Sequence, residues 1–157
     1  MKELLPIYTK RLVIVNTSVD DINLILKMDK QEETQKYLGG IKNKSREERI
    51  EFLSNKKNSL TVLLNNEKIG FVGLKINDDK AEISYIFDSD YTGCGYCSEV
   101  VSSLVDIAFN KLKLHKIYAY CKDENIASIK VLTKNGFIKK DNDNKEFIYY
   151  ELERGSL

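Results

Sequence analysis

Apolar residues recur at helical spacing in the segment that begins after Gly95. About every fourth position is apolar, which produces one stripe along a helix and predicts that this stripe packs on a sheet. This is the clearest helix that the sequence predicts. The positions of the stripe are Val100, Val101, Leu104, Val105, Ala108, Phe109 and Leu112.

Shorter apolar runs, separated by turn residues, predict strands. The three middle runs are divided by residues 65–67 and 77–79, both rich in Asn and Asp, which favour tight turns and therefore an antiparallel meander. The last two runs flank residues 141–144 and predict a final hairpin. The predicted strands span residues 11–16, 60–65, 68–76, 81–88, 116–121, 137–140 and 146–151.

Three further helices are predicted from polar residues at their starts. Short polar side chains accept hydrogen bonds from the free amide groups of a first turn, and a Ser-x-x-Glu spacing is typical of a capping box. The segment between the first two of these helices is less regular and predicts no element. The helices span residues 17–28, 45–53 and 126–135, and the irregular segment is 29–43.

The composition indicates a single domain over residues 1–157. With 42% hydrophobic residues the chain can bury one core. Lys and Arg number 25 against 24 Asp and Glu, so the net charge of +1 lacks the basic excess of a nucleic-acid-binding domain. No run approaches the ~20 apolar residues of a membrane helix. Three cysteines, an odd count, argue against a disulfide framework. We therefore expect a soluble, cytoplasmic protein with neither nucleic acid nor membrane as a partner.

A glycine loop provides the most informative functional pattern. This loop follows a predicted strand and directly precedes the amphipathic helix. Glycine adopts positive backbone angles at little cost, so successive amide groups converge, and the helix start adds further free donors. Such a loop is suited to hold an anion, and a phosphate-bearing cofactor is the expected ligand. The alternative for a Gly-x-Gly taken alone is a tight turn that starts a helix. The loop is Thr92, Gly93, Cys94, Gly95, Tyr96 and Cys97.

A second polar cluster, at Asn125 and Ser128, begins the helix 126–135, and Gly136 with Phe137 follows that helix. The order of strand, Gly-x-Gly helix, strand, Asn-x-x-Ser helix and Gly-Phe strand resembles the GCN5-related N-acetyltransferases (GNAT), particularly the RimJ/RimL-like branch. The resemblance spans nearly the whole chain. It implies an α/β fold in which a mixed, mostly antiparallel sheet, splayed at its centre, is flanked by about four helices.

The resemblance also implies acetyl-coenzyme A as the cofactor. Backbone amides of residues 92–97 would face the pyrophosphate. The family usually has Arg or Gln before the first glycine and often a basic residue after it, whereas this chain has Thr92 and Cys94, so a side-chain donor is lost. Asn125 would contact the pantetheine arm, Ser128 would hydrogen-bond the departing sulfur, and Lys134 would lie near the phosphates. The alternative is that Asn125 and Ser128 only cap the helix and that Lys134 is a solvated surface lysine.

Residues 81–85 (Ala-Glu-Ile-Ser-Tyr) are similar to the Ala-Glu-Ile-Gly-Tyr run on the family's central strand. An acceptor amine with a pKa near ~10 must lose a proton, and a carboxylate in a partly desolvated cleft is a suitable base. Glu82 is therefore the candidate catalytic base, with a simple ion pair to a lysine as the alternative. By the same resemblance, amide groups near Ile86 and Phe87 would bind the acetyl carbonyl and pantetheine, and Ser84 in place of the usual glycine would narrow that cleft.

The implied reaction is transfer of an acetyl group from acetyl-coenzyme A to a primary amine by direct attack, in a monomer or homodimer. The acceptor is a small molecule or a peptide, and a protein N-terminus, a polyamine, an aminoglycoside and an amino-acid derivative all remain open. Glu33 and Tyr37 are candidates for attracting a cationic amine. The alternative function is a non-catalytic module of the same fold that binds acyl-coenzyme A as a sensor.

Cysteines suggest two rival functions. Cys94 and Cys97 form a Cys-x-x-Cys at a helix start, where thiol pKa values fall and disulfide exchange becomes possible. A thioredoxin-like fold, however, also needs a proline loop beside that motif, and the only proline is Pro6. His115 and Cys121 would complete four zinc ligands, but their spacing is unusual and Cys121 lies on a predicted strand. We expect no metal site.

Overall fold

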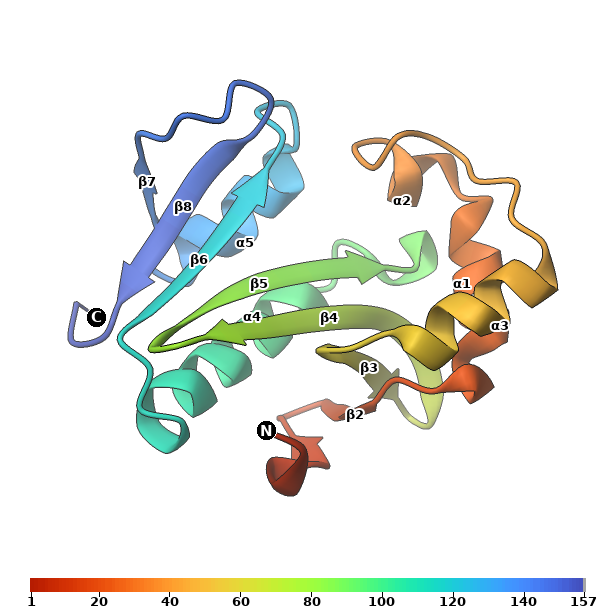
Figure 1. Ribbon diagram of the computed structural model, residues 1–157, viewed down its shortest axis with the longest axis horizontal. Helices are drawn as coiled ribbons and strands as arrows, with labels where there is room; N and C mark the ends of the chain where they lie inside the picture. The colour runs from red at the N-terminus through yellow and green to blue at the C-terminus, as the bar shows by residue number, and fades with distance from the viewer. Residues whose placement is uncertain (157) are drawn as a thin grey trace. The chain divides into compact units, whose positions relative to one another are not determined.

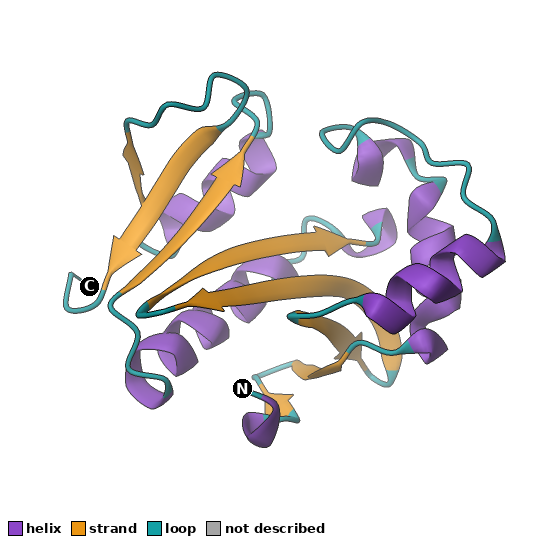
Figure 2. Cartoon of the chain, viewed as in Figure 1, coloured by secondary structure: helices purple, strands orange, loops and turns teal. Residues whose placement is uncertain are grey.

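The computed structural model describes residues 1–156 and has an α/β fold (Figures 1 and 2). Within these residues eight strands form one mixed sheet in the order β1-β2-β3-β4-β5-β6-β8-β7. The recorded pairs are antiparallel except for β5 with β6, which confirms the predicted mostly antiparallel sheet. The strands are β1 (Ile7–Tyr8), β2 (Leu12–Asn16), β3 (Ser59–Leu64), β4 (Glu67–Asn77), β5 (Lys80–Phe87), β6 (Lys116–Cys121), β7 (Ile138–Lys140) and β8 (Ile148–Glu153).

Five α-helices occur among the described residues, one more than the sequence predicts. The additional helix, α2, is a single turn inside the segment 29–43, where the polar sequence has no apolar stripe to indicate it. The predicted amphipathic helix is α4, which continues as a π-helical turn over Ile107–Lys111. The helices are α1 (Ile22–Asp29), α2 (Glu32–Gln35), α3 (Arg46–Asn55), α4 (Tyr96–Asp106) and α5 (Ile126–Lys134). None of them is long and apolar enough to cross a membrane.

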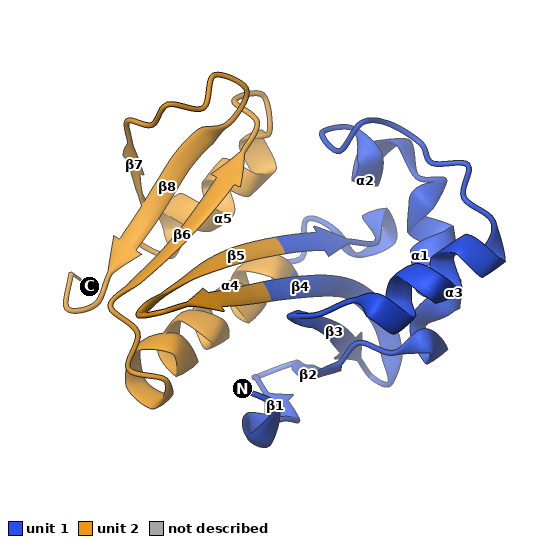
Figure 3. Ribbon diagram, in the orientation of Figure 1, with its two compact units in different colours: residues 1–73, 85–96 blue, residues 74–84, 97–157 orange. Residues whose placement is uncertain are grey.

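The chain divides into two compact units, coloured separately in Figure 3. Unit 1 comprises Met1–Gly73 and Tyr85–Tyr96, and unit 2 comprises Leu74–Ser84 and the chain from Cys97 onward. Strands β4 and β5 each run from one unit into the other. The prediction of a single domain stays a prediction.

Unit 1 has its own apolar cluster beneath α1 and α3. Buried residues of both helices pack with Phe71 of β4. The helix starts follow from the sequence: Ser18 and Asp21 form a capping box before α1, and Ser45 and Glu48 form the predicted one before α3. Each box satisfies two amide groups that a first turn leaves free. The buried cluster consists of Ile22, Leu24, Ile25, Met28, Leu53 and Phe71.

Unit 2 contains the parallel strand pair. Its register joins Lys80, Ala81 and Glu82 to Lys116, Ile117 and Tyr118, which are the first three residues of β5 and of β6. Pairing at one end of both strands is the arrangement of a splayed sheet. On its other side β6 pairs antiparallel with β8. The apolar stripe of α4 is buried as predicted, at Val100, Val101, Leu104 and Val105.

The end of α5 follows the sequence prediction closely. Gly136 has a φ of 87°, a left-handed conformation that residues with a Cβ rarely adopt. Its amide donates to the Thr133 carbonyl at 3.1 Å, and the Phe137 amide donates to the Leu132 carbonyl at 3.0 Å. These two bonds make a Schellman motif, which ends the helix and sends the chain toward β7.

Candidate functional site

The glycine loop connects β5 to α4 and has the predicted backbone. Gly93 and Gly95 have φ angles of 80° and 82°. A Cβ built on Gly93 would meet no atom within 4 Å, so the space beside this glycine is open. The first turn of α4 begins at Tyr96 and contributes its own unpaired amide groups. Residues 92–97 contain no acidic side chain, so the loop has the donors and the charge that an anionic ligand requires.

Arg11 lies outside the glycine loop in the sequence but contacts it in the structure, and the sequence did not indicate this contact. Its Nη1 donates to the Cys94 carbonyl at 3.0 Å, and its Cζ lies 4.5 Å from the centre of the Tyr96 ring. Its Nη2 would lie 3.4 Å from a Cβ on Gly95. Arg11 thus brings a positive charge to the loop, in which the usual basic positions are occupied by Thr92 and Cys94. It is separated from Cys94 by 83 positions, so no local motif could have found it.

Asp88 fixes the end of β5 just before the loop. Its buried carboxylate accepts from Lys27 Nζ at 2.7 Å, from Gln31 Nε2 at 2.8 Å and from the Asp90 amide at 3.0 Å. Burial favours the neutral acid, but these bonds outweigh it and hold the pKa of Asp88 below its usual value. The anchored carboxylate orders the start of the glycine loop.

Ile86 and Phe87 lie on β5 immediately before Asp88. Phe87 is buried, and its carbonyl accepts from the Thr34 hydroxyl at 3.2 Å. Ile86 is half-buried and packs against the apolar cluster of unit 1. The strand end is therefore held by packing on one residue and by a hydrogen bond on the next. The predicted binding of the acetyl carbonyl by these amides stays a prediction.

Asn125 and Ser128 lie at the start of α5, and Lys134 is exposed in its last turn. Asn125 caps the helix, since its Oδ1 accepts from the Ser128 amide at 3.1 Å. Burial raises the pKa of the Cys121 thiol, and a hydrogen bond with the buried Ser128 side chain partly offsets this rise. The Asn125 cap that the sequence suggests is thus present, and the Ser128 hydroxyl lies beside the Cys121 sulfur.

Glu82 is a half-buried residue of β5 whose register partner on β6 is Tyr118. It forms no ion pair with any Lys or Arg of residues 1–156, so the alternative of a lysine-paired carboxylate has no support. Burial and the Glu82 charge both raise the pKa of Tyr118. The rings of Tyr118, Tyr120 and Tyr149 lie 5.2–6.1 Å apart. This tyrosine cluster and Glu82 together suit a cationic group.

Glu33 and Tyr37, the candidates for attracting an acceptor, lie in and just after α2. Glu33 is exposed. The Tyr37 ring is half-buried, and Lys36 Nζ lies 5.5 Å from its centre. A role for either residue in binding the acceptor stays a prediction.

The cysteine environment is unlike that of a redox pair. Cys94 is exposed and Cys97 is half-buried at the start of α4. Burial raises the pKa of the Cys97 thiol to about 12, which keeps this thiol protonated and unreactive at neutral pH. Among residues 1–156, no group of three His, Cys, Asp or Glu side chains is arranged to hold a metal ion.

Comparison with known families places most of the chain in one family of enzymes. Residues 11–138 match the model of the acetyltransferase (GNAT) domain. The chain belongs to the GNAT family. This GNAT protein is 38% identical over 64 residues to the uncharacterized N-acetyltransferase YnaD of Bacillus subtilis, and the match covers 38% of each chain. The chain spans about a third to a half of the length of the curated relatives that it matches.

Solved structures agree with the GNAT fold over more of the chain. A GNAT-family acetyltransferase from Bacillus anthracis has a TM-score of 0.83 at 23% identity, covering 94% of this chain and 97% of that one. The spermidine N-acetyltransferase of Vibrio cholerae, solved with CoA and spermine, has a TM-score of 0.78 at 20% identity and covers 93% and 97%. At these identities the likeness establishes the fold.

Proposed function

We propose that this GNAT protein transfers the acetyl group of acetyl-coenzyme A to a primary amine, as a member of the RimJ/RimL-like branch. The observation that carries the proposal is the glycine loop: two glycines with positive φ, the start of α4, and Arg11 against the loop. Amide donors and one guanidinium are the groups that bind a pyrophosphate. A structural neighbour that was solved with CoA supports the same ligand.

The residues proposed to hold the coenzyme fall into three groups. Backbone amides of residues 92–97 and the Arg11 guanidinium would hold the pyrophosphate. Amides near Ile86 and Phe87 bind the acetyl carbonyl and the pantetheine, and Asn125 contacts the arm through the amide nitrogen that its cap leaves available. Lys134 would contact the phosphates. When bound, the coenzyme supplies an activated thioester.

Glu82 is proposed to accept a proton during the reaction, and Ser128 is proposed to donate a hydrogen bond. Glu82 accepts a proton from the acceptor ammonium, directly or through water, and the nearby tyrosine rings stabilise the cation before it is deprotonated. Ser128 would donate a hydrogen bond to the coenzyme sulfur, which gains negative charge during acetyl transfer. Because the ion pair that would neutralise Glu82 is absent among the described residues, its carboxylate is available for this role.

A panel of amines tests the proposal. An enzyme releases free coenzyme thiol when incubated with acetyl-coenzyme A and at least one primary amine, whereas a non-catalytic sensor only binds the coenzyme saturably. We expect amine-dependent thiol release that exceeds the rate without amine. Saturable binding with no release across polyamines, aminoglycosides, amino acids and peptides would favour the sensor.

Arg11→Gln is expected to weaken coenzyme binding about tenfold, because it removes a charge-assisted hydrogen bond and the positive charge beside the loop. Titration of the protein with coenzyme A measures this change. Lys10→Gln is the matched control, since it alters the net charge equally on the neighbouring exposed side chain. Equal affinities of the Arg11 and Lys10 variants would remove Arg11 from the site.

Ser128→Ala is expected to lower kcat about tenfold and to change the coenzyme Kd less than about twofold, since the bond to sulfur strengthens only as charge develops. Thr133→Ala is the control, because it deletes an exposed hydroxyl from the same helix. Thermal unfolding checks that the loss of the Cys121 contact has not disturbed α5. A change in Kd as large as that in kcat contradicts the assigned role.

A further inference from the structure

A pocket of about 350 Å³ opens in unit 1, between α1, α3, the segment in and after α2, the middle of β4 and the end of β5. This volume lies in the lower part of the range of about 300–1,000 Å³ that is typical of small-molecule sites. Much of the wall is apolar and includes Ile25, Met28 and Phe71 of the buried cluster. Ile86, whose amide is proposed to bind the acetyl group, also lines it. An apolar group of moderate size fits this space.

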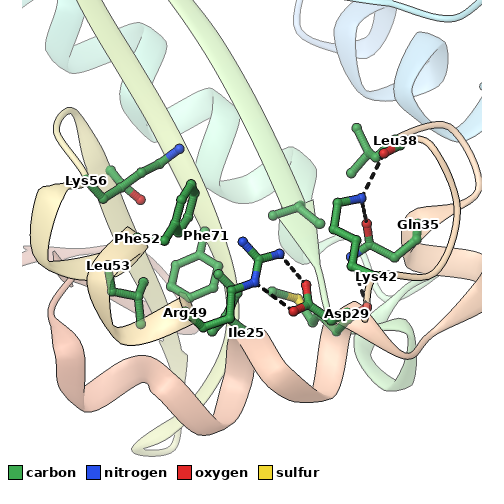
Figure 4. Close-up of a pocket in the computed structure, with 13 residues that line it drawn as sticks. Ile25, Asp29, Gln35, Leu38, Lys42, Arg49, Phe52, Leu53, Lys56 and Phe71 are labelled. Carbon is green, nitrogen blue, oxygen red and sulfur yellow. Dashed lines mark hydrogen bonds and ion pairs between the residues drawn. The ribbon is translucent and has the colours of Figure 1, made fainter. Parts of the chain in front are cut away.

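The polar centre of the pocket is an ion pair between two buried residues, Asp29 and Arg49 (Figure 4). Arg49 Nε donates to Asp29 Oδ2 at 2.7 Å, and Nη2 donates to Oδ1 at 2.5 Å. The guanidinium also lies 5.0 Å from the centre of the Phe52 ring. Two hydrogen bonds and a stacked ring fix its orientation, so the donors it has left point in a set direction.

One nitrogen of this guanidinium has no partner within the described residues. Figure 4 shows two nitrogens of Arg49 bonded to Asp29, and the remaining one, Nη1, turned away from that carboxylate. No buried side-chain nitrogen or oxygen of residues 1–156 lacks a hydrogen-bond partner, so Nη1 keeps some surface that a small group can reach. The edge formed by Nη1 and the second Nη2 hydrogen offers parallel donors, which match a carboxylate.

The charges around the pocket favour an anion. Lys42 and Lys56 line it together with Arg49, against the single carboxylate of Asp29. Lys42 Nζ donates to Gln35 Oε1 at 2.7 Å and to the Leu38 carbonyl at 2.8 Å, which holds its charge at the pocket (Figure 4). Because Asp29 already neutralises one cation, two positive charges remain. A polycation would be repelled here.

We propose that this pocket binds an acceptor amine that also carries a carboxylate and an apolar side chain, as an apolar α-amino acid does. Arg49 binds the carboxylate through its free edge, and the walls formed by Ile25, Met28 and Phe71 take the side chain. This inference rests on the proposed acetyl transfer and narrows its acceptor. Polyamines and aminoglycosides, which bring only positive charge, are disfavoured by the same residues.

The test compares leucine with leucinamide, which has the same side chain and an α-amine but lacks the carboxylate, and with spermidine. Thiol release from acetyl-coenzyme A is measured for each. We expect KM for leucine to be lower than that for leucinamide by about 10- to 100-fold, the value of a charge-assisted pair. If leucinamide or spermidine is acetylated as efficiently as leucine, or more efficiently, the proposed pocket function is overturned. The acetyltransferase function itself is then still supported.

Arg49→Lys tests the two parallel donors of the guanidinium, because lysine keeps a positive charge beside Asp29 but lacks these paired N–H groups. It is expected to raise KM for leucine about tenfold or more and to leave KM for leucinamide and coenzyme affinity unchanged. Arg46→Lys is the matched control on the exposed face of the same helix. An equal rise for leucine and leucinamide would indicate a general disturbance of the pocket and overturn the role of Arg49.

A binding measurement separates this inference from the proposed function and needs no turnover. N-acetylleucine is expected to raise the thermal midpoint of the wild-type protein more than N-acetylleucinamide does, by mass action on the folded state. Equal shifts overturn the carboxylate site whether or not the protein is an enzyme. If no amine of the panel is acetylated, the acetyltransferase proposal fails, and this comparison alone decides the pocket. If Arg49→Lys does not fold, the two wild-type comparisons still decide it.

Discussion

Replacing Gly93 with valine is expected to weaken coenzyme A binding about 100-fold or more. At a φ of 80° a β-branched residue carries backbone strain of about 1–3 kcal/mol, which the loop relieves by moving its amide groups out of register with the phosphates. The valine side chain also fills the open space beside this glycine, where a ligand would approach. Calorimetric titration with coenzyme A measures the loss.

Gly155→Val is the control that introduces the same backbone strain away from the glycine loop. Gly155 has a φ of 87°, and a Cβ there would also meet nothing within 4 Å. It lies far along the chain from the glycine loop. Both variants are expected to lose similar stability, and only the Gly93 variant to lose coenzyme affinity. If the two variants bind coenzyme A like the wild type, the phosphate site lies elsewhere.

Replacing Glu82 with glutamine is expected to lower the rate of thiol release about 100-fold near neutral pH, the usual size of a general-base contribution. An acceptor amine with a pKa near ~10 is almost fully protonated at pH 7 and depends on a base. At alkaline pH the amine is already neutral, so the rates of the variant and of the wild type should converge. The ratio of the two rates across the range from about pH 6 to 10 is the diagnostic quantity.

Glu153→Gln provides the comparison for Glu82. Glu153 is a strand carboxylate with a lysine neighbour, Lys116, at 3.8 Å, which is the structural role that the sequence left open for Glu82. The Glu153 variant is expected to show the same pH profile as the wild type. A rate reduced by one constant factor at every pH in the Glu82 variant would assign that residue a structural role.

Local patterns predicted the elements whose causes are local. The stripe of α4, the capping box at Ser45 and Glu48, and the glycine that ends α5 each involve residues within a few positions of one another. Their energies come from neighbours that the sequence shows directly. The positive φ angles of Gly93 and Gly95 belong to the same class, since only glycine accepts them at little cost.

Short polar elements were less predictable. Helix α2 has four residues and no apolar stripe, so its formation depends on its surroundings. One visible contact is that of Gln35, which is buried and donates to the Met28 carbonyl at 2.9 Å. A glutamine in a polar stretch gives no sign in the sequence that it will be buried.

The sequence by itself therefore determined the order of the longer elements, the glycine loop and the identity of the family, but indicated neither the two-residue strand β1 nor the single-turn helix α2. Tertiary structure alone decided which distant side chains serve these features: Arg11 against the glycine loop, and Arg49 with Asp29 in the pocket of unit 1. These pairs are separated by 83 and 20 positions. The sequence does not distinguish the guanidinium of Arg49 from that of Arg11. Only the packing of the folded chain sets Arg49 against Asp29 and Arg11 against the glycine loop.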